Sequence, residues 1–290
     1  MFISVIIPTY NNNTELRLCL ASLDAQSIGK DAFEVVVVDN GSKTPASEIT
    51  QLFPFCRCVQ ESKPGSYNAR NTGVEYAKGD ILAFTDADCL PHSDWLKNSH
   101  RLMAQNPNWQ AIGGDIEVTL SETPNSAEIY ESIFSLKQRV YVTELGFAAT
   151  ANLIVRRDAF DATGHFDGGL LSGGDYDWSR RYAMAGGQLH FAPDVLVRHP
   201  ARASYRGLVK KRRRVIGGRR LVDGRYPNHS SQRTINQQYG ASQNLKLLMN
   251  SATEHVSLLR SWQVLAMKLS LGIVARYEKA RLALGGTPLR

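Results

Sequence analysis

Three short apolar segments, each followed directly by polar residues, constrain the fold of this chain more than any other feature. They are Ile3–Ile7, Phe33–Val38 and Asp80–Thr85, and helical patterns at 16–23 and 66–76 separate them. Nearly unbroken apolar runs are typical of strands that are covered on both faces of a sheet. Because parallel neighbouring strands need crossover helices, this alternation predicts an α/β fold with a doubly wound sheet.

The residues that follow the three strands are the first candidates for a functional site. They are Pro8-Thr9-Tyr10, Asp39-Asn40-Gly41-Ser42 and Asp86-Ala87-Asp88. Ligands of open α/β sheets bind beyond the carboxyl ends of the strands. An Asp-x-Asp pair taken alone is also compatible with a solvated loop. The shared position of the three segments instead predicts one site, in which a carboxylate binds a divalent metal and a second one contacts a neighbouring group.

The short glycine-rich motifs that bind phosphate are absent from the sequence. The chain has neither a Gly-x-x-x-x-Gly-Lys-Ser/Thr loop nor a Gly-x-Gly-x-x-Gly segment after its first strand. These absences disfavour a P-loop hydrolase and a dinucleotide dehydrogenase. Any bound phosphate would therefore need a metal ion and side chains to neutralise it.

Two further segments contain residues that are suited to catalysis or binding. Arg70 lies near the start of a helical pattern, and its position is compatible with a surface arginine or with a contact to a ligand near Asp39. The segment Gly173–Trp178 leads into a helix with two acids and two aromatic residues. A carboxylate there could act as a general base and Trp178 could face a sugar ring. Capping of the helix by its acids and burial of its aromatic residues is the alternative.

The second half of the chain shows a different pattern of elements. We expect strands at Gln110–Leu120, Leu153–Val155 and Leu189–Arg198. A helix is expected from the apolar spacing of Ile129 to Val140, with others at Asp158–Ala162 and Asp175–Ala185, and a polar stretch covers Asn228–Gln243. No internal repeat is present.

Positive charge is concentrated in one segment. The net charge of the chain is +7, and Arg198–Tyr226 contains eleven Lys or Arg residues against one acid, Asp223. The segment lacks an aromatic platform or a nucleic-acid motif, so we predict no nucleic-acid partner. A solvated helical face is the simplest interpretation. We favour contact with anionic lipid or a lipid-diphosphate acceptor, since each basic residue near such a surface contributes about 1 kcal/mol.

The C-terminal region contains an apolar stripe at helical spacing. Its members are Leu258, Leu259, Trp262, Leu265, Ala266, Leu269 and Ile273. Such a helix can lie on a bilayer, pack on the catalytic domain or bind a second subunit as a homo-oligomer. The pattern leaves these three uses open.

The four cysteines and the N-terminus indicate a cytoplasmic protein. Cys19, Cys56, Cys58 and Cys89 have neither the number nor the spacing of a disulfide framework or a zinc site, so we expect reduced thiols. The N-terminus lacks a signal-like segment, and no run of about 18 apolar residues is present. We therefore predict a cytoplasmic location, with peripheral contact to the inner face of the membrane.

Five of these segments together resemble the family-2 glycosyltransferases, which have the GT-A fold. The segments occur in order over residues 3–200, and they are Ser4–Asn11, Val38–Ser42, Ala69–Gly73, Thr85–Asp88 and Gly173–Trp178. Each is weak alone, but five in order are highly specific. The resemblance implies inverting transfer from a nucleotide-diphosphate sugar with a divalent metal, Mn²⁺ or Mg²⁺. It also implies a GT-A-type mixed sheet with a nucleotide-sugar half (1–110), an acceptor half (111–205) and a basic, helical extension (206–290).

The resemblance carries a role over to each matching residue. The residues implied to bind the donor are Pro8, Thr9, Tyr10, Asp39, Arg70 and Asp86. Asp88 is implied as the metal ligand, and His199 resembles a histidine that approaches the metal in several members. Asp175 matches the catalytic base, while Asp177 and Trp178 lie where acceptor contacts are expected.

Two departures from the family pattern bear on the function. Gly174 stands where many members have Glu, and the Gln-x-x-Arg-Trp signature of processive synthases is missing. We therefore predict addition of one sugar, with uridine as the expected nucleotide, to a glycan or lipid-linked acceptor in cell-surface polysaccharide or glycoconjugate synthesis. The alternative is a catalytically inactive protein of this fold that binds sugar nucleotides or membranes. A nucleotidyltransferase is disfavoured, because Pro8-Thr9-Tyr10 supplies no glycine-rich basic loop.

Overall fold

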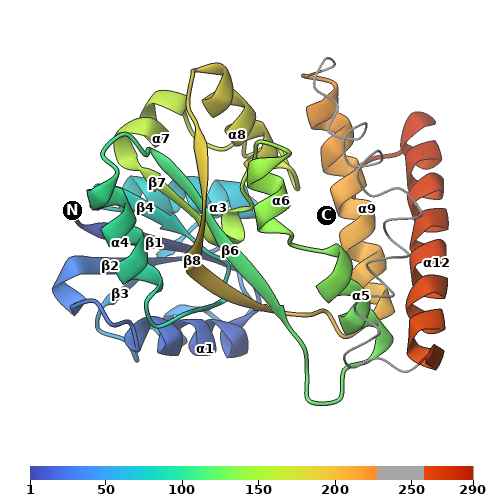
Figure 1. Cartoon of the computed structure of the whole chain (residues 1–290), viewed down its shortest axis with the longest axis horizontal. Helices are drawn as coiled ribbons and strands as arrows, with labels where there is room; N and C mark the ends of the chain where they lie inside the picture. Colours follow the sequence, from blue (N-terminus) through green and yellow to red (C-terminus); the bar gives the residue numbers. More distant parts are fainter. Residues whose placement is uncertain (227–257, 290) are drawn as a thin grey trace. The chain divides into compact units, whose positions relative to one another are not determined.

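The computed structural model describes residues 1–226 and 258–289 of the chain, and these form two compact units (Figure 1). Unit 1 contains Met1–Glu117 and Lys137–His199, and unit 2 contains Val118–Leu136 and Pro200–Arg290. Residues 118–136, which we expected in an acceptor half at 111–205, thus belong with the C-terminal region. The expected polar stretch at Asn228–Gln243 lies outside the described residues.

An eight-stranded mixed sheet is the centre of the described fold (Figure 1). Its order is β3-β2-β1-β4-β7-β6-β8-β5. The strands are β1 (Ile3–Thr9), β2 (Phe33–Asp39), β3 (Cys56–Gln60), β4 (Ile81–Phe84), β5 (Leu90–Pro91), β6 (Ala111–Thr119), β7 (Leu153–Arg156) and β8 (Leu189–Pro200). Strands β1 to β4 pair in parallel, β7 is antiparallel to β4 and β6, and β5 is antiparallel to β8. The predicted doubly wound mixed sheet is confirmed.

The central strands are apolar because helices cover the sheet. Every residue of β1 from Ile3 to Ile7 is fully buried, as are Val35–Val38 of β2. Helix α1 (Asn13–Asp24) buries the predicted stripe from Leu16 to Leu23. Helix α3 (Ser66–Tyr76) approaches so closely that a Cβ atom on its Gly73 would lie 2.5 Å from a methyl group of Ile6. The parallel half of the sheet is therefore a rigid platform.

The remaining helices agree with the sequence pattern in most places. They are α2 (Ser47–Thr50), α4 (Trp95–Gln105), α5 (Ser126–Phe134), α6 (Gln138–Thr143), α7 (Arg157–Thr163), α8 (Gly174–Met184), α9 (Tyr205–Asp223) and α12 (Leu258–Ala283). The single helix expected through Ile129–Val140 is wrong, because the structure has α5 and α6 with a break between them. Leu136 in the break has φ 51°, a left-handed conformation that an α-helix cannot continue through.

Unit 2 has its own core, which is formed by helices. Helix α12 packs along α9 and α5. Two apolar clusters hold the helices together, Ala127, Leu208 and Leu271 in the first and Ile216, Ala275 and Leu282 in the second. Among the described residues, no helix is both long enough and apolar enough to cross a membrane.

Candidate functional site

The loops after β1 and β2 meet at the carboxyl edge of the sheet. Thr9 is in register with Asp39, and the N–H of Asn40 donates a hydrogen bond to the Thr9 carbonyl at 2.9 Å. Beyond the strands, the N–H of Asn11 donates to Ser42 Oγ at 2.9 Å, and the N–H of Lys43 donates to Asn11 Oδ1 at 2.8 Å. Two of the three segments singled out in the sequence therefore form one connected surface.

The carboxylate of Asp39 shapes the loop that follows β2. Its Oδ1 accepts from the N–H of Ser42 and its Oδ2 from the N–H of Ala46, both at 2.9 Å, and Gln60 Nε2 donates at 3.3 Å. Burial alone would raise the pKa of Asp39, but these hydrogen bonds outweigh it and the pKa is lowered. Asp39 is thus a buried carboxylate that stays ionised. A direct contact between Asp39 and a nucleotide base stays a prediction.

Three buried polar atoms near this surface have no hydrogen-bond partner among the described residues. They are Thr9 Oγ1, Asn13 Oδ1 and Arg70 Nε. Most buried polar atoms in proteins are paired, so an orphaned one calls for an explanation. Thr9 and Arg70 were singled out from the sequence as ligand contacts, whereas Asn13 was not, and a polar ligand would supply the missing partners. Beside Thr9, Pro8 is half-buried and Tyr10 is exposed.

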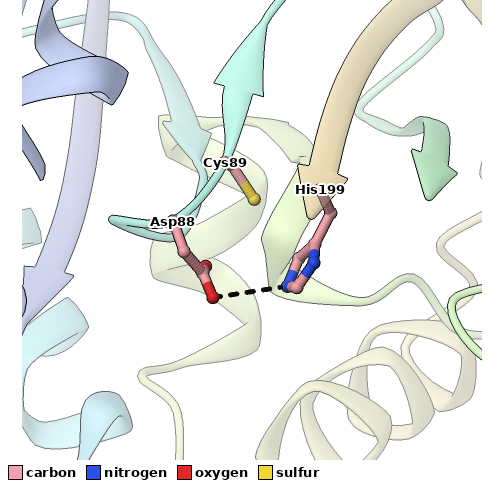
Figure 2. A group of neighbouring side chains, drawn as sticks. All are labelled: Asp88, Cys89 and His199. Atoms are coloured by element: carbon pink, nitrogen blue, oxygen red, sulfur yellow. Dashed lines mark ion pairs between the residues drawn. The ribbon is translucent and has the colours of Figure 1, made fainter. Parts of the chain in front are cut away.

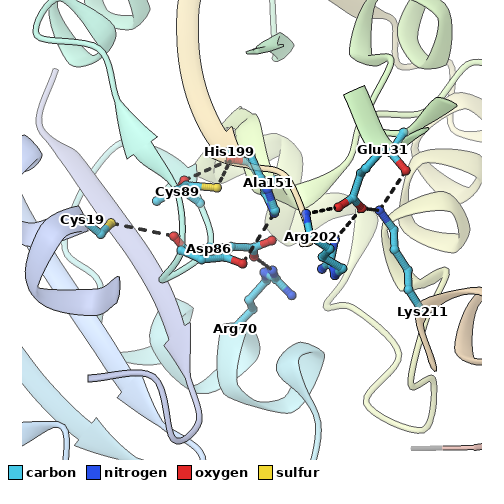
Figure 3. A network of polar contacts seen from close by, with 12 residues as sticks. Cys19, Arg70, Asp86, Cys89, Glu131, Ala151, His199, Arg202 and Lys211 are labelled. Carbon is cyan, nitrogen blue, oxygen red and sulfur yellow. Dashed lines mark hydrogen bonds and ion pairs between the residues drawn. The ribbon is translucent and has the colours of Figure 1, made fainter. Parts of the chain in front are cut away.

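Arg70 and Asp86 form an ion pair at the end of β4 (Figure 3). The side chain of Arg70 projects from α3 and is almost fully buried, whereas that of Asp86 is one-third exposed. A buried guanidinium is costly unless it is paired, so Asp86 holds Arg70 in place. The exposed part of the Asp86 carboxylate remains accessible to a ligand.

Asp88 and His199 meet although 110 residues separate them in the sequence (Figure 2). His199 Nε2 lies 3.6 Å from Asp88 Oδ2, and the potential ligand atoms of Asp88, Cys89 and His199 all lie within 4.8 Å of one another. The imidazole is almost fully buried, and the Asp88 side chain is one-third exposed. Strand β8 brings His199 to this position, and the loop after β4 brings Asp88.

The chemistry of these donors fits a divalent cation. Carboxylate oxygen and imidazole nitrogen are suitable ligands for Mn²⁺, and both groups are present. Burial raises the pKa of the Cys89 thiol well above its usual range, so its sulfur stays protonated and is a poor ligand for a hard cation. Asp88 and His199 are therefore the two residues that would hold the metal.

Asp175 lies in the first turn of α8 and contacts Tyr67 of α3. The Tyr67 hydroxyl donates to Asp175 Oδ1 at 3.2 Å, and the N–H of Tyr176 donates to the same oxygen at 2.9 Å. Burial raises the pKa of Asp175 above its ordinary value. Those two hydrogen bonds and the charge of Arg70 oppose the rise, while the charge of Asp86 adds to it. Asp175 therefore belongs to the same electrostatic cluster as the Arg70–Asp86 pair.

Gly174 is explained by the ring of Tyr67. A Cβ atom at position 174 would lie 2.7 Å from Cε2 of that ring, which is closer than real Cβ contacts. Any side chain at 174, including the Glu of many family-2 members, would displace Tyr67 in this arrangement. Tyr67, which contacts Asp175, was not among the site residues predicted from the sequence. Its position one helical turn before Arg70 was the signal that could have found it.

Trp178 and Asp177 do not face a ligand, and their expected acceptor contacts are therefore corrected. Trp178 is fully buried, its Nε1 donates to the carbonyl of Gly164 at 3.0 Å, and its ring stacks between Phe160 and Tyr182. Asp177 is also buried, and its carboxylate pairs with Arg181 at 3.1 Å one turn further along α8. Burial of Trp178 was the alternative that the sequence left open, whereas Asp177 pairs with Arg181 and the N-terminus of α8 has no side-chain cap.

Comparisons with known proteins identify the family to which the chain is similar. Residues 4–164 match the family model of glycosyl transferase family 2. The chain is 38% identical over 222 residues to glycosyltransferase AglE of Haloferax volcanii, covering 75% of this chain and 72% of that protein. It is also 24% identical over 227 residues to a protein of Methanococcus voltae, and this match covers 72% of this chain and 70% of that protein. That protein is named dolichyl N-acetyl-α-D-glucosaminyl phosphate 3-β-D-2,3-diacetamido-2,3-dideoxy-β-D-glucuronosyltransferase.

Solved structures show the same fold. The mannosyltransferase PcManGT of Pyrobaculum calidifontis, solved with GDP-Man and Mn²⁺, superposes with a TM-score of 0.58 at 20% sequence identity. The match covers 97% of this chain and 74% of the other. Since the family model matches more than half of the chain and AglE is similar over most of its length, the chain is an enzyme of glycosyl transferase family 2.

Proposed function

We propose that this glycosyltransferase inverts the anomeric centre as it moves a sugar from a UDP-linked donor to a hydroxyl of a glycan or lipid-linked acceptor. The acceptor would belong to cell-surface polysaccharide or glycoconjugate synthesis. In this proposal Asp175 is the general base, and Asp88 with His199 holds a divalent metal. Contact with an anionic surface through residues 198–226 and the C-terminal helix would bring the enzyme to its acceptor.

The observation that carries the proposal is the position of Tyr67, whose hydroxyl donates to Asp175 Oδ1 at 3.2 Å and whose ring centroid lies 5.5 Å from Arg70 Cζ. A base and a donor site must lie close together, because the attacking hydroxyl has to reach the anomeric carbon. Asp175 comes from α8 and the Arg70–Asp86 pair from α3 and the end of β4, yet both charges act on the pKa of Asp175. This proximity supports a single reaction centre.

The surroundings of Asp175 suit a general base. As the acceptor oxygen attacks, Oδ2 of Asp175 would take its proton, and the nucleoside diphosphate would leave from the opposite face of the sugar. Burial raises the pKa of Asp175 above its ordinary value, which makes the carboxylate a stronger proton acceptor. The Tyr67 hydroxyl and the Tyr176 N–H hold one carboxylate oxygen, so that the other is oriented for the acceptor.

The donor side would use the orphaned polar atoms and the charges beside them. Thr9 Oγ1 and Arg70 Nε lack partners among the described residues, and a donor's hydroxyl and phosphate oxygens would satisfy them. The metal held by Asp88 and His199 would supply positive charge for the leaving diphosphate. Support for the acceptor class comes from the relative of Methanococcus voltae, whose name specifies a dolichyl phosphate-linked sugar.

Replacement of Asp175 by Asn tests the base directly. We expect Asp175→Asn to lose about 10²–10⁴-fold in turnover, because the amide cannot accept the proton. Donor affinity should be retained. Since burial disfavours the ionised carboxyl, the variant should also unfold at the same temperature as the wild type or a higher one. The measurements are Mn²⁺-dependent release of nucleotide from a panel of sugar donors, donor titration and thermal unfolding.

The exposed Asp161→Asn variant in α7 is the matched control and should behave as the wild type. Wild-type turnover in Asp175→Asn would contradict the assigned base. A wild-type protein that binds donors but turns none over would instead favour the catalytically inactive alternative.

A further inference from the structure

Helix α12 has two apolar faces on opposite sides of its axis. One face, with Val264, Leu271, Ala275 and Leu282, is buried in unit 2. The second consists of Trp262, Ala266, Leu269, Ile273, Tyr277 and Ala280, and all six side chains are exposed. Their spacing of three or four residues places them on one side of an α-helix, and we call this set the outer stripe.

The outer stripe is too large and too regular for scattered surface apolar residues. Its four large side chains are 67% (Trp262), 64% (Leu269), 66% (Ile273) and 61% (Tyr277) exposed. Isolated exposed apolar residues are ordinary, but a contiguous stripe of large ones marks an interaction site. The core of unit 2 does not use it, because the packed face of α12 already fills that role.

The charges around the outer stripe indicate what covers it. Helices α9 and α12, which lie side by side, contain thirteen Lys or Arg residues and two acids, Asp223 and Glu278. Glu278 is buried and already pairs with Arg213 and Arg281 at 2.7 and 2.5 Å. The helix pair therefore carries a large positive surplus, and the exposed Arg276 and Lys279 place part of it on α12 itself.

A pocket between the same two helices gathers part of this surplus. It has a volume of about 170 Å³, and Arg212, Arg219, Arg220 and Lys279 line it with one acid, Asp223. Lys279 lies next to Ala280 of the outer stripe in α12. Lys279 thus lies on the helix that carries the outer stripe, and the positive surplus of the helix pair attracts anionic headgroups towards it.

We propose that the outer stripe of α12 lies in the surface of an anionic lipid bilayer, with the exposed cations of α12 on the phosphate headgroups and the positive charge of α9 adding to the attraction. A helix of this kind binds in the plane of the membrane, its apolar side chains in the acyl boundary and its cations in the headgroup layer. Trp and Tyr side chains suit that boundary, because each has an apolar body and a polar end. No described helix can span a membrane, which agrees with an in-plane position.

A second copy of the chain is the less favoured occupant because it would bring the same charge. Two stripes that meet face to face would place the positive surplus of one α9–α12 pair against that of another, and like charges repel. An anionic bilayer supplies the opposite charge over the whole surface. The inference deepens the membrane contact in the proposed function, but its test needs no sugar transfer, so the two can fail separately.

Vesicle binding tests this surface with Trp262 as the probe. Two of the chain's four tryptophans, Trp95 and Trp178, are fully buried, and Trp109 stacks on His190, whereas Trp262 is mostly exposed. With vesicles of phosphatidylglycerol and phosphatidylcholine, we expect co-flotation, a blue shift of tryptophan emission and weaker acrylamide quenching. The fluorescence changes should vanish in Trp262→Phe. Binding should fall with salt and be absent with phosphatidylcholine alone.

A double substitution in the outer stripe and a control substitution elsewhere distinguish specific binding by the stripe from non-specific adsorption to vesicles. Leu269→Ser with Ile273→Ser should weaken partitioning at least about tenfold, since two large apolar side chains no longer enter the bilayer. Leu18→Ser in α1, a position that is 56% exposed, should leave it unchanged. Unchanged melting temperatures would show that all variants fold.

Three results would overturn the inference. The first is equal vesicle binding by the wild type and the double variant. The second is binding to anionic vesicles without any change in Trp262 fluorescence. The third is a wild-type dimer in analytical ultracentrifugation that the double variant abolishes while vesicle binding persists, because the second copy would then occupy the outer stripe.

Discussion

The ring of Tyr67 and the absence of a side chain at Gly174 depend on each other. The ring of Tyr67 fills the space beside Gly174, and its hydroxyl donates to the carboxylate of the next residue, Asp175. The centroid of the Tyr67 ring also lies 5.5 Å from Cζ of the Arg70 guanidinium. One aromatic side chain therefore contacts both the expected base and the expected donor site. Tyr67 is a positioning residue for Asp175 in the proposed reaction.

We expect Tyr67→Phe to move the pH dependence of turnover. The Tyr67 hydrogen bond favours the ionised carboxylate and so lowers the pKa of Asp175, and its loss should raise that pKa further. The base must be ionised to act, so the acidic limb of the pH profile should move to higher pH, by roughly one to two units if the hydrogen bond contributes about 1.5–3 kcal/mol. The measurement is kcat from pH 5 to 9.

A matched control for this variant is Tyr76→Phe, which alters a half-exposed tyrosine of the same helix. It should keep the wild-type profile. A uniform loss of turnover at every pH in Tyr67→Phe, without a shifted limb, would mean that the hydroxyl does not tune Asp175.

At the scale of elements, Glu131 attaches α5 to the segment before α9 and to α9 itself (Figure 3). It is fully buried and pairs with Arg202 at 2.7 Å and Lys211 at 2.6 Å. Burial by itself would raise the pKa of Glu131, but the two cations lower it to about 2. Burial also lowers the pKa of Lys211 despite its partner, so the cost of desolvating the ammonium offsets part of the gain.

We expect Glu131→Gln to destabilise unit 2 by up to about 3 kcal/mol, because it leaves two partly buried cations without their counter-charge. The exposed Glu122→Gln variant should change little. Because the pKa of Glu131 is lower in the folded protein than its ordinary value of 4.5, its stabilisation is complete above that value and is lost as the pH falls towards about 2. Urea unfolding at pH 7 and pH 3 measures both effects, and an equal midpoint for Glu131→Gln and wild type at pH 7 would contradict the role.

The elements show where sequence patterns suffice. The buried strands and α3 were predicted within a few residues, because apolar runs and helical spacing report burial directly. Strand β3 was missed, since Cys56–Gln60 lies at the edge of the sheet, is only partly buried and shows no apolar run. The break between α5 and α6 was missed because the apolar spacing continues through Leu136, and nothing local signals its positive φ.

At the candidate site, too, local sequence features could be predicted and contacts between distant segments could not. Asp86, Asp88 and Asp175 could be singled out as candidates because strand ends and helix starts are local features of the sequence. The meeting of Asp88 with His199 depends on the antiparallel half of the sheet, so it could only be implied by the family resemblance. Trp178 was misplaced because an aromatic residue at a helix start has the same pattern whether it faces a ligand or the core. The hydrogen bond from Tyr67 to Asp175 depends on the packing of α3 against α8, which no local pattern reports.

Across the whole molecule, the fold brings Asp88 and His199 from distant segments to within 3.6 Å of each other, as the proposed metal site requires. We expect Asp88→Ala to reduce the Mn²⁺-dependent increase in affinity for UDP at least roughly tenfold, because a carboxylate ligand is the larger contributor of charge. His199→Ala should have an effect of the same sign. Calorimetry with UDP in the presence and absence of Mn²⁺ measures this, with Asp161→Ala as the exposed control. An unchanged Mn²⁺ increment in Asp88→Ala would exclude it as a ligand.

The buried carboxylate of Asp39 has a consequence for how a donor is captured. Because it binds the backbone N–H groups of residues 42 and 46, the loop after β2 is already held in one conformation by the protein itself. A nucleotide that binds there, as proposed, would lose little free energy to the ordering of that loop. Loosening this anchor would then weaken capture of the donor through the loop, in addition to any contact that Asp39 itself makes.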